Sequence, residues 1–294
     1  MGTFDGVHIG HQKILQKVLN STCNNNYNSV VLTFFPHPRM VLNQQADIKL
    51  LHTLAEKQHL LEQFGIDSLI VHPFDEAFAN LSAEEFVKNI LVDIFKTQKI
   101  IIGYDHRFGK NRSADITVLK EFGIKYGFEV EEISAQEINE VSVSSTKIRT
   151  ALTEGNIEKA NQYLGHAYTL SGSVQRGRGI GKTINFATAN LKINEPYKLI
   201  PKDGVYVVSA IIDNKQVMGM MNIGYNPTVE GKTQSIEVHF LNFNQNLYDA
   251  SLQIFLHKRI RNELKFNNLE ALKNQLEKDK QTTLEYFKTA GNKL

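Results

Sequence analysis

Two histidines, His8 and His11, lie three residues apart in the stretch GTFDGVHIGH, directly before a helical pattern over Gln12 to Leu19. On a helix this spacing places both rings on one face. Gly6 and Gly10 let the backbone pass close to a ligand, and the free amides at a helix start attract phosphate. The residues alone support phosphate binding and an ordinary helix start with surface histidines equally. A divalent metal pair is a third interpretation, for which no third ligand is evident nearby.

Two further segments could bind a nucleotide, and each also has a plain structural interpretation. VSSTKIR (Val143 to Arg149) is typical of a capped helix start, with Ser144 or Ser145 as the cap. GRGIGKTINFATANL (Gly177 to Leu191) looks superficially like a phosphate-binding loop. That motif requires glycine at position 176, where Arg176 stands, so the pattern fails.

Short apolar runs alternate with helical patterns in the first half of the chain. Strands are predicted over Ser29 to Phe35, Ser68 to His72, Lys99 to Gly103 and Phe128 to Ile133, and helices over Thr53 to Phe64 and Ser82 to Phe95. Ser82 and Glu85 form a capping box for the second helix. This alternation indicates an α/β, Rossmann-like domain with a parallel sheet. Ligands bind beyond the carboxyl ends of such strands; GTFDGVHIGH, FFPHPR (Phe34 to Arg39) and YDHRFGKNRSAD (Tyr104 to Asp115) would lie there.

The second half changes character after a helical stretch from Ser145 to Gly165. Strand-like runs follow, split by turn residues such as Asp213-Asn214 and Pro227: YTLSGSVQ, GVYVVSAIID, KQVMGMMNIG, QSIEVHFLNF and ASLQIFLHKRI. We predict a β-barrel closed by a charged helix over Asn268 to Phe287. The chain then divides into two domains, residues 1–165 and 166–294. Glu237 alternates with apolar neighbours, as an exposed carboxylate of a strand would.

The composition argues against several classes of function. The 294 residues include 33 basic and 31 acidic side chains, and the formal net charge of +2 gives no reason to expect nucleic acid or a membrane as partner. The single cysteine, Cys23, excludes an internal disulfide and fits a reducing compartment. No apolar run reaches about 18 residues and no secretory leader is recognised. We expect a cytoplasmic protein that acts on small molecules, and weak self-association is left open.

The motifs taken together resemble a known family. HIGH after a glycine-rich turn, followed later by SSTKIR, resembles the nucleotidylyltransferase superfamily. GRGIGKTINFATANL resembles the riboflavin kinase signature, and KLIPKDGVY, NIGYNPT and SIEVHFLNF follow in order. The whole chain is similar to the bifunctional riboflavin kinase/FMN adenylyltransferases of bacteria. The resemblance implies phosphorylation of riboflavin to FMN by ATP, then adenylylation of FMN to FAD with release of pyrophosphate, with Mg²⁺ required.

The resemblance also implies roles for individual residues. Glu237, His8, His11 and Arg149 would be catalytic, with Glu237 as the base for the ribityl hydroxyl. Thr188 and Asn190 would hold the magnesium ion of Mg-ATP. ATP would be bound by Gly2, Phe4, Gly6, His8, Gly10, His11, Ser145, Thr146, Arg149, Gly177, Gly181, Lys182, Thr188 and Asn190. The flavin in the first domain would be bound by Pro36, His37, Pro38, Asp105, Arg107 and Phe108.

Three positions depart from the family pattern. Ala187 stands where the kinase signature has proline, so the turn before Thr188 loses a fixed φ. Thr3 stands where the family often has asparagine. Only three residues precede Phe4, too few for a strand of about five residues, so the chain looks trimmed at its start. We therefore expect adenylylation to be weaker or less heat-stable than phosphorylation.

Two other functions stay open. The protein could transfer a nucleotide to another phosphorylated acceptor, with the barrel as a specificity module. It could also be a flavin-binding protein with reduced catalysis.

Overall fold

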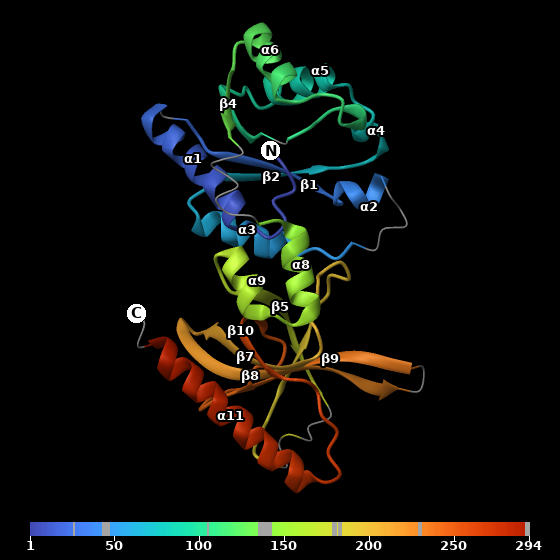
Figure 1. Ribbon diagram of the computed structural model, residues 1–294, viewed down its shortest axis with the longest axis vertical. Helices are drawn as coiled ribbons and strands as arrows, with labels where there is room; N and C mark the ends of the chain where they lie inside the picture. Colours follow the sequence, from blue (N-terminus) through green and yellow to red (C-terminus); the bar gives the residue numbers. More distant parts are fainter. Residues whose placement is uncertain are drawn as a thin grey trace. The chain divides into compact units, whose positions relative to one another are not determined.

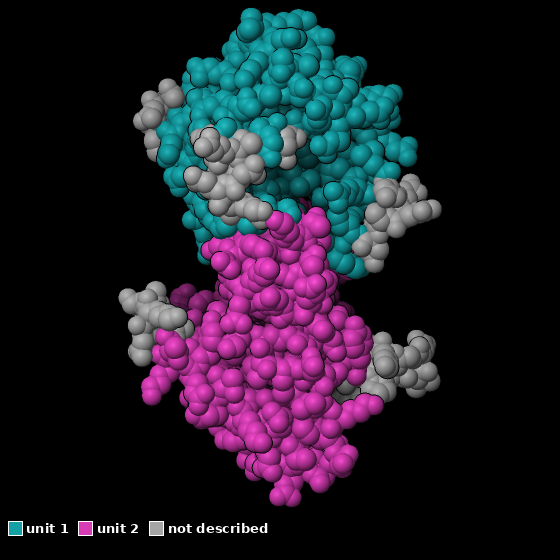
Figure 2. Space-filling model, viewed as in Figure 1, with its two compact units in different colours: residues 1–50, 57–144 teal, residues 51–56, 145–294 magenta. Residues whose placement is uncertain are grey.

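The computed structural model describes residues 1–25, 27–42, 48–104, 106–134, 143–177, 181, 184–228 and 231–291. They form two compact units, of residues 1–50 with 57–144 and of residues 51–56 with 145–294 (Figure 2). A short segment from the first half of the chain therefore belongs to the second unit. The units divide between Ser144 and Ser145, whereas the predicted domain boundary lies at Gly165. The assignment of catalytic domains to residues 1–165 and 166–294 stays a prediction.

The first unit contains the predicted parallel strands, of which β1, β2 and β4 are labelled in Figure 1. β1 (Val30–Phe35) pairs with β2 (Ser68–Pro73), and β3 (Lys99–Gly103) pairs with β4 (Glu129–Ile133), both in parallel. The two pairs are separate sheets, but Leu32 of β1 shares one core cluster with Ile100 and Ile102 of β3. Residues 1–8 form no strand, although the Gly2 amide donates to the Leu32 carbonyl at 2.9 Å. The prediction of strands and parallel pairing is confirmed, and the pairs are not joined into one sheet.

The helices of the first unit connect these strands. They are α1 (Ile9–Asn25), α2 (Pro38–Leu42), α3 (Leu54–Gln63), α4 (Glu76–Ala79), α5 (Ala83–Phe86) and α6 (Ile116–Tyr126), with the first turn of α3 in the second unit. The capping box of Ser82 and Glu85 is present at the start of α5. The helix predicted beyond it continues as a π-helical segment, Val87–Val92, which buries Val87, Ile90 and Leu91. A 3₁₀ turn, Lys110–Arg112, follows β3.

The second unit begins with two short helices rather than one. α8 (Ser145–Glu154) ends before Gly155, whose φ of 83° is left-handed, and α9 (Ile157–Leu164) starts after Asn156. The Asn156 side chain accepts a hydrogen bond from the Lys159 amide at 3.2 Å and so caps α9. The sequence prediction of one helical stretch was correct in type but missed this break.

Six strands then close into the predicted barrel in the order β10, β5, β6, β9, β8, β7. Their bounds are β5 (Tyr168–Gln175), β6 (Ala189–Lys192), β7 (Gly204–Ile212), β8 (Lys215–Thr228), β9 (Gly231–Phe240) and β10 (Ser251–Arg261). Asp213 and Asn214, with φ of 49° and 59°, form the tight turn between β7 and β8. Pro227, predicted as a turn residue, instead lies within β8, opposite Lys232.

The long helix α11 (Leu269–Gly291) covers one side of the barrel (Figure 1). Leu272 and Leu276 pack on a buried cluster of Ile184, Phe186 and Met220. Arg261 of β10 donates to both oxygens of the Asp279 carboxylate, from Nε at 3.0 Å to Oδ1 and from Nη2 at 2.7 Å to Oδ2. The helix predicted over Asn268 to Phe287 is thus confirmed and is fixed by apolar packing and a charge pair.

Candidate functional site

The glycine-rich loop before α1 is tightly turned and buried. The backbone φ is positive at Phe4 (45°), Gly6 (97°) and Val7 (40°). A β-branched residue such as Val7 rarely adopts this conformation, and each such residue costs about 1–3 kcal/mol. Phe4, Asp5 and Val7 are all buried. The surrounding structure therefore holds a strained loop at the position where sequence analysis placed phosphate.

Lys57 of α3 supports this loop. Its Nζ donates to the Thr3 carbonyl at 2.7 Å and to Thr33 Oγ1 of β1 at 3.2 Å. Burial lowers the pKa of Lys57 to about 8, and the Asp5 carboxylate opposes that shift. On the other side of the loop, Gln12 Nε2 donates to the Val7 carbonyl at 2.9 Å. The loop is thus fixed to α1, α3 and β1.

The two histidines are stacked at the start of α1. The helix begins at Ile9 rather than at Gln12, so His8 directly precedes it and His11 lies in its first turn. Their rings are parallel with centroids 3.7 Å apart, and the His11 amide donates to His8 Nδ1 at 3.4 Å. A Cβ on Gly10 would lie 3.3 Å from the His8 ring, so glycine leaves room for that ring.

His11 has the properties of a neutral ligand-binding group. Its Nδ1 is buried and has no hydrogen-bond partner among the described residues. Burial, His8 and Lys57 together hold the pKa of His11 well below its usual value of 6.5. A neutral imidazole can donate a hydrogen bond to phosphate without adding a fixed charge to the site.

Two other predicted ATP-binding residues of this loop, Phe4 and Gly2, make contacts within the protein. The Phe4 side chain is 5% exposed and packs in the core, with its ring centroid 5.1 Å from that of His11. The Gly2 amide already donates a hydrogen bond to the Leu32 carbonyl. The structure therefore leaves the Phe4 side chain unavailable to a ligand.

The predicted flavin segments follow the carboxyl ends of β1 and β3, as the fold requires. Pro36, His37 and Pro38 come directly after β1, and Arg107 is exposed after β3. The Phe108 side chain is only 8% exposed and packs in the core, so its ring is not at the surface. Asp105 lies outside the described residues.

A chain of aromatic rings connects these two segments. Phe34 of β1 contacts Phe78 with centroids 5.4 Å apart, Phe78 contacts Phe86 at 5.8 Å, and Phe86 contacts Phe108 at 6.0 Å. These contacts bring the end of β1 and the segment after β3 into one part of the first unit. Phe108 thus has a packing role that the sequence did not indicate.

The VSSTKIR segment forms the start of α8, which confirms the predicted helix start. Ser145 is the first residue of the helix, and the Thr146 carbonyl accepts a hydrogen bond from Thr150 Oγ1 at 3.2 Å. Ile148 is fully buried and Arg149 is half-buried. This segment belongs to the second compact unit, whereas the histidines belong to the first.

A row of polar residues crosses three neighbouring barrel strands. Asn190 of β6 lies opposite Glu237 of β9, and Glu237 lies opposite Asn222 of β8. Opposed residues of antiparallel strands share one face of the sheet, so the three side chains lie side by side, each half-buried. Thr188 Oγ1, just before β6, donates to Glu237 Oε2 at 3.0 Å. The structure brings together three predicted residues, Thr188, Asn190 and Glu237, and adds Asn222.

The glycine-rich segment before β6 approaches this row. A Cβ on Gly177 would overlap the Asn190 side-chain amide, which would then have to shift. The Gly181 carbonyl accepts a hydrogen bond from the Phe186 amide at 2.8 Å. Lys182 lies outside the described residues.

The turn between these glycines and β6 has a side-chain support of its own. His239 Nδ1 donates to the Ala187 carbonyl at 2.8 Å. Burial lowers the pKa of His239, and this hydrogen bond opposes the shift. Like Lys57 and Asn222, His239 was not predicted as a site residue, because the sequence does not reveal which distant residues meet.

The oxygen donors beside Glu237 fit a magnesium ion. Among the described residues no three or more His, Cys, Asp or Glu side chains are grouped as a metal site. Mg²⁺ with a nucleotide needs only one or two protein oxygens, because phosphates and water supply the others. The hydroxyl of Thr188 and the amide oxygen of Asn190, both beside Glu237, supply such oxygens.

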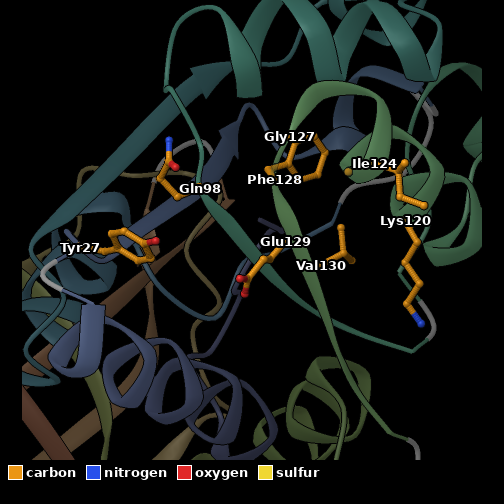
Figure 3. Close-up of a pocket in the computed structure, with 9 residues that line it drawn as sticks. Tyr27, Gln98, Lys120, Ile124, Gly127, Phe128, Glu129 and Val130 are labelled. Atoms are coloured by element: carbon orange, nitrogen blue, oxygen red, sulfur yellow. The ribbon is translucent and has the colours of Figure 1, made fainter.

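A surface hollow of about 560 Å³ lies elsewhere in the first unit (Figure 3). It is formed by the last turns of α6 and by β4, with Phe128 and Ile124 among its lining residues. None of the predicted site residues lines it. We assign it no part in the chemistry.

Comparison with known proteins identifies two families along the chain. Residues 1–147 match the FAD synthetase family, and residues 164–287 match the riboflavin kinase family. A bifunctional riboflavin kinase/FMN adenylyltransferase of Buchnera aphidicola subsp. Schizaphis graminum is 40% identical over 98% of this chain and 93% of that protein. Proteins of the same name from Listeria monocytogenes and Bacillus subtilis are 39% and 38% identical, over 98% of this chain and 91% of each of those proteins.

One crystal structure is similar over nearly the whole chain. It is named a macrolide-efflux protein from Streptococcus pneumoniae, with a TM-score of 0.87 and 30% identity over 96% of this chain and 92% of that chain. Among the residues described for this chain, no helix is long and apolar enough to span a membrane.

Proposed function

The chain belongs to the bifunctional riboflavin kinase/FMN adenylyltransferase family, and from that premise we propose which residues carry its two reactions. The protein phosphorylates riboflavin to FMN with ATP, and it adenylylates FMN to FAD with release of pyrophosphate. The two other functions, nucleotide transfer to another phosphorylated acceptor and flavin binding with reduced catalysis, are not needed to explain either half of the chain.

For the kinase reaction we propose Glu237 as the base that accepts the proton of the ribityl hydroxyl. The observation that carries this proposal is the hydrogen bond from Thr188 to Glu237, beside Asn190 in register on the next strand. Thr188 and Asn190 would hold Mg-ATP, and we propose Gly177, Gly181 and Lys182 as further ATP-binding residues. The ion, when bound, neutralises charge on the transferred phosphoryl group. Positioning then supplies most of the remaining catalysis, because phosphoryl transfer needs little covalent chemistry from the protein.

For the adenylylation we propose that His8, His11 and the amides around Gly10 bind the triphosphate. The phosphate of FMN is already a nucleophile, so this reaction needs no general base. It needs donors placed where negative charge grows on the α-phosphate. The neutral His11, with its buried and unpartnered Nδ1, supports this role. The family pattern gives Ser145, Thr146 and Arg149 as further ATP-binding residues.

For the flavin of the adenylylation reaction we propose Pro36, His37, Pro38, Asp105 and Arg107. Their position after the carboxyl ends of β1 and β3 supports this assignment. Phe108 is included only through its backbone, because its ring packs in the core. We also propose that the protein works in the cytoplasm.

The test of this proposal is product analysis with the purified chain. With riboflavin, ATP and Mg²⁺, chromatography should show FMN and then FAD, and EDTA should stop both reactions. Thr188→Ala and Asn190→Ala should each raise the KM for ATP in riboflavin phosphorylation. Unchanged ATP dependence in both variants would contradict the assignment of Mg-ATP to this row.

A further inference from the structure

We propose that His239 is a positioning residue for the riboflavin kinase reaction, which holds the Ala187 carbonyl and thereby fixes Thr188 and Asn190 in place. This inference rests on the proposed function, because Thr188 and Asn190 are the proposed Mg-ATP residues. It adds a residue that itself contacts neither nucleotide nor flavin in this account.

The geometry places His239 and Glu237 on one face of the same strand. They are two residues apart on β9, and side chains at this spacing point to the same side of a sheet. His239 Nδ1 donates to the Ala187 carbonyl at 2.8 Å, and Glu237 Oε2 accepts from Thr188 Oγ1 at 3.0 Å. Two consecutive residues of the turn are therefore held by two alternate residues of β9.

Backbone hydrogen bonds between β6 and β9 do not hold Ala187 and Thr188 in place. Pairing of β6 with β9 begins at Ala189, opposite Val238, so Ala187 and Thr188 precede the paired residues. A carbonyl just outside a sheet needs another donor, and here the imidazole supplies it. Ala187 also lacks the ring that would fix φ if proline stood there. The hydrogen bond from His239 therefore holds the Ala187 carbonyl, and the hydrogen bond from Thr188 to Glu237 holds the next residue.

The neighbouring packing keeps the imidazole in position. The Phe186 ring, which is 5% exposed, lies 5.0 Å from the His239 ring, centroid to centroid. Phe186 belongs to the buried cluster on which Leu272 and Leu276 of α11 pack. A purely structural role for His239 would consist of this ring contact, so the test must separate the ring from its hydrogen bond.

Three variants of the full chain make that separation. His239→Phe keeps an aromatic ring and removes the donor, whereas His239→Asn keeps an N–H near the position of Nδ1. His239→Phe combined with Ala187→Pro removes the donor but restricts φ at the turn. The measurements are KM and kcat for riboflavin phosphorylation, Mg-ADP binding by calorimetry, and the urea midpoint of unfolding. FMN adenylylation serves as the internal control.

We expect His239→Phe to raise the KM for ATP and to weaken Mg-ADP binding by about three- to tenfold, the effect of one hydrogen bond, with a smaller change in kcat. His239→Asn should stay near the original values, and Ala187→Pro should restore much of the binding lost in His239→Phe. FMN adenylylation and the urea midpoint should change little.

The proposal is overturned if His239→Phe binds Mg-ADP as well as the original chain does. It is also overturned if His239→Asn is impaired together with a lower urea midpoint while His239→Phe is not, since the ring packing alone would then be responsible. Failure of the underlying assignment is distinguishable, because Thr188→Ala would then leave Mg-ADP binding unchanged.

Discussion

Lys57 and His239 were not predicted as site residues, yet each holds a backbone carbonyl at one of the two proposed sites. Lys57 reaches the Thr3 carbonyl over 54 positions of sequence, and His239 reaches the Ala187 carbonyl over 52. Loop carbonyls without a ladder partner need such donors. The motifs themselves could be predicted from sequence, because their residues are local. The supporting donors could not, because folding alone decides which distant residue meets which carbonyl.

Replacing Lys57 tests the support of the glycine-rich loop. Lys57→Met removes two hydrogen bonds to the loop and β1 and leaves Asp5 buried beside an uncharged group. We expect a loss of about 1–3 kcal/mol of unfolding free energy per unsatisfied partner and at least a tenfold lower kcat/KM for FMN adenylylation. Riboflavin phosphorylation should be unaffected. Lys120→Met, at a side chain that is 50% exposed, is the control; equal adenylylation by both variants would show that Lys57 does not position the loop.

Most elements could be predicted from sequence, and the exceptions have physical causes. β1 to β4 are short apolar runs between helical patterns, and all four were predicted. β6 was not, because it has only four residues, ANLK, and alternates polar side chains. Gly155 divides the predicted helix of the second unit, because its φ of 83° ends α8. Thr188, Asn190 and Glu237 were predicted as site residues, but the register of β6, β8 and β9 that places Asn222 beside them could not be predicted.

The segment Leu51–Glu56 shows how an element of the first half is built into the second unit. Lys198 Nζ donates to Glu56 Oε2 at 2.6 Å and to the Leu51 carbonyl at 2.6 Å. The Ser171 amide donates to Glu56 Oε1 at 2.9 Å. Both charged side chains are nearly inaccessible, at 0% and 1% exposure. Removing one partner of a buried pair leaves the other charge uncompensated, which is more costly than removing both.

Substitutions at this pair should therefore be non-additive. Lys198→Met should lower the unfolding free energy of the second unit by about 3–5 kcal/mol. The double variant Lys198→Met with Glu56→Gln should recover part of that loss, as followed by urea unfolding. Additive losses in the double-mutant cycle would mean that the pair is not coupled in the folded protein.

Buried histidines give the whole molecule a common response to acid. Burial is the largest cause that lowers the pKa of His11, of His106 (to about 3), of His239 and of His257. The unfolded chain therefore binds more protons than the folded chain below about pH 6.5. The contribution of these histidines to stability should be full above that pH and be lost as the pH falls toward their folded pKa values. Carboxylates with a lowered pKa, such as Glu131, also stabilise the folded chain, and that contribution is lost only below about pH 4.5.

Urea unfolding between pH 7.5 and 5 checks this expectation. The unfolding free energy should fall by at most about 1.4 kcal/mol per pH unit for each such histidine. His257→Gln should reduce the slope, whereas His59→Gln, at a histidine whose side chain is 48% exposed, should leave it unchanged. A midpoint independent of pH across this range would contradict the burial argument.

The central claim is that one chain carries two reactions on two different sets of residues. Glu237 accepts a hydrogen bond from Thr188 in the barrel, and the His11 ring stacks on the His8 ring in the first unit. A general base contributes about 10²- to 10⁴-fold, so Glu237→Gln should nearly abolish FMN formation from riboflavin. The most direct measurement is the rate of both steps in Glu237→Gln and His11→Ala, with riboflavin or FMN supplied separately. Glu237→Gln should keep FAD formation from FMN, and His11→Ala should keep FMN formation from riboflavin; loss of both activities in either variant would contradict the account.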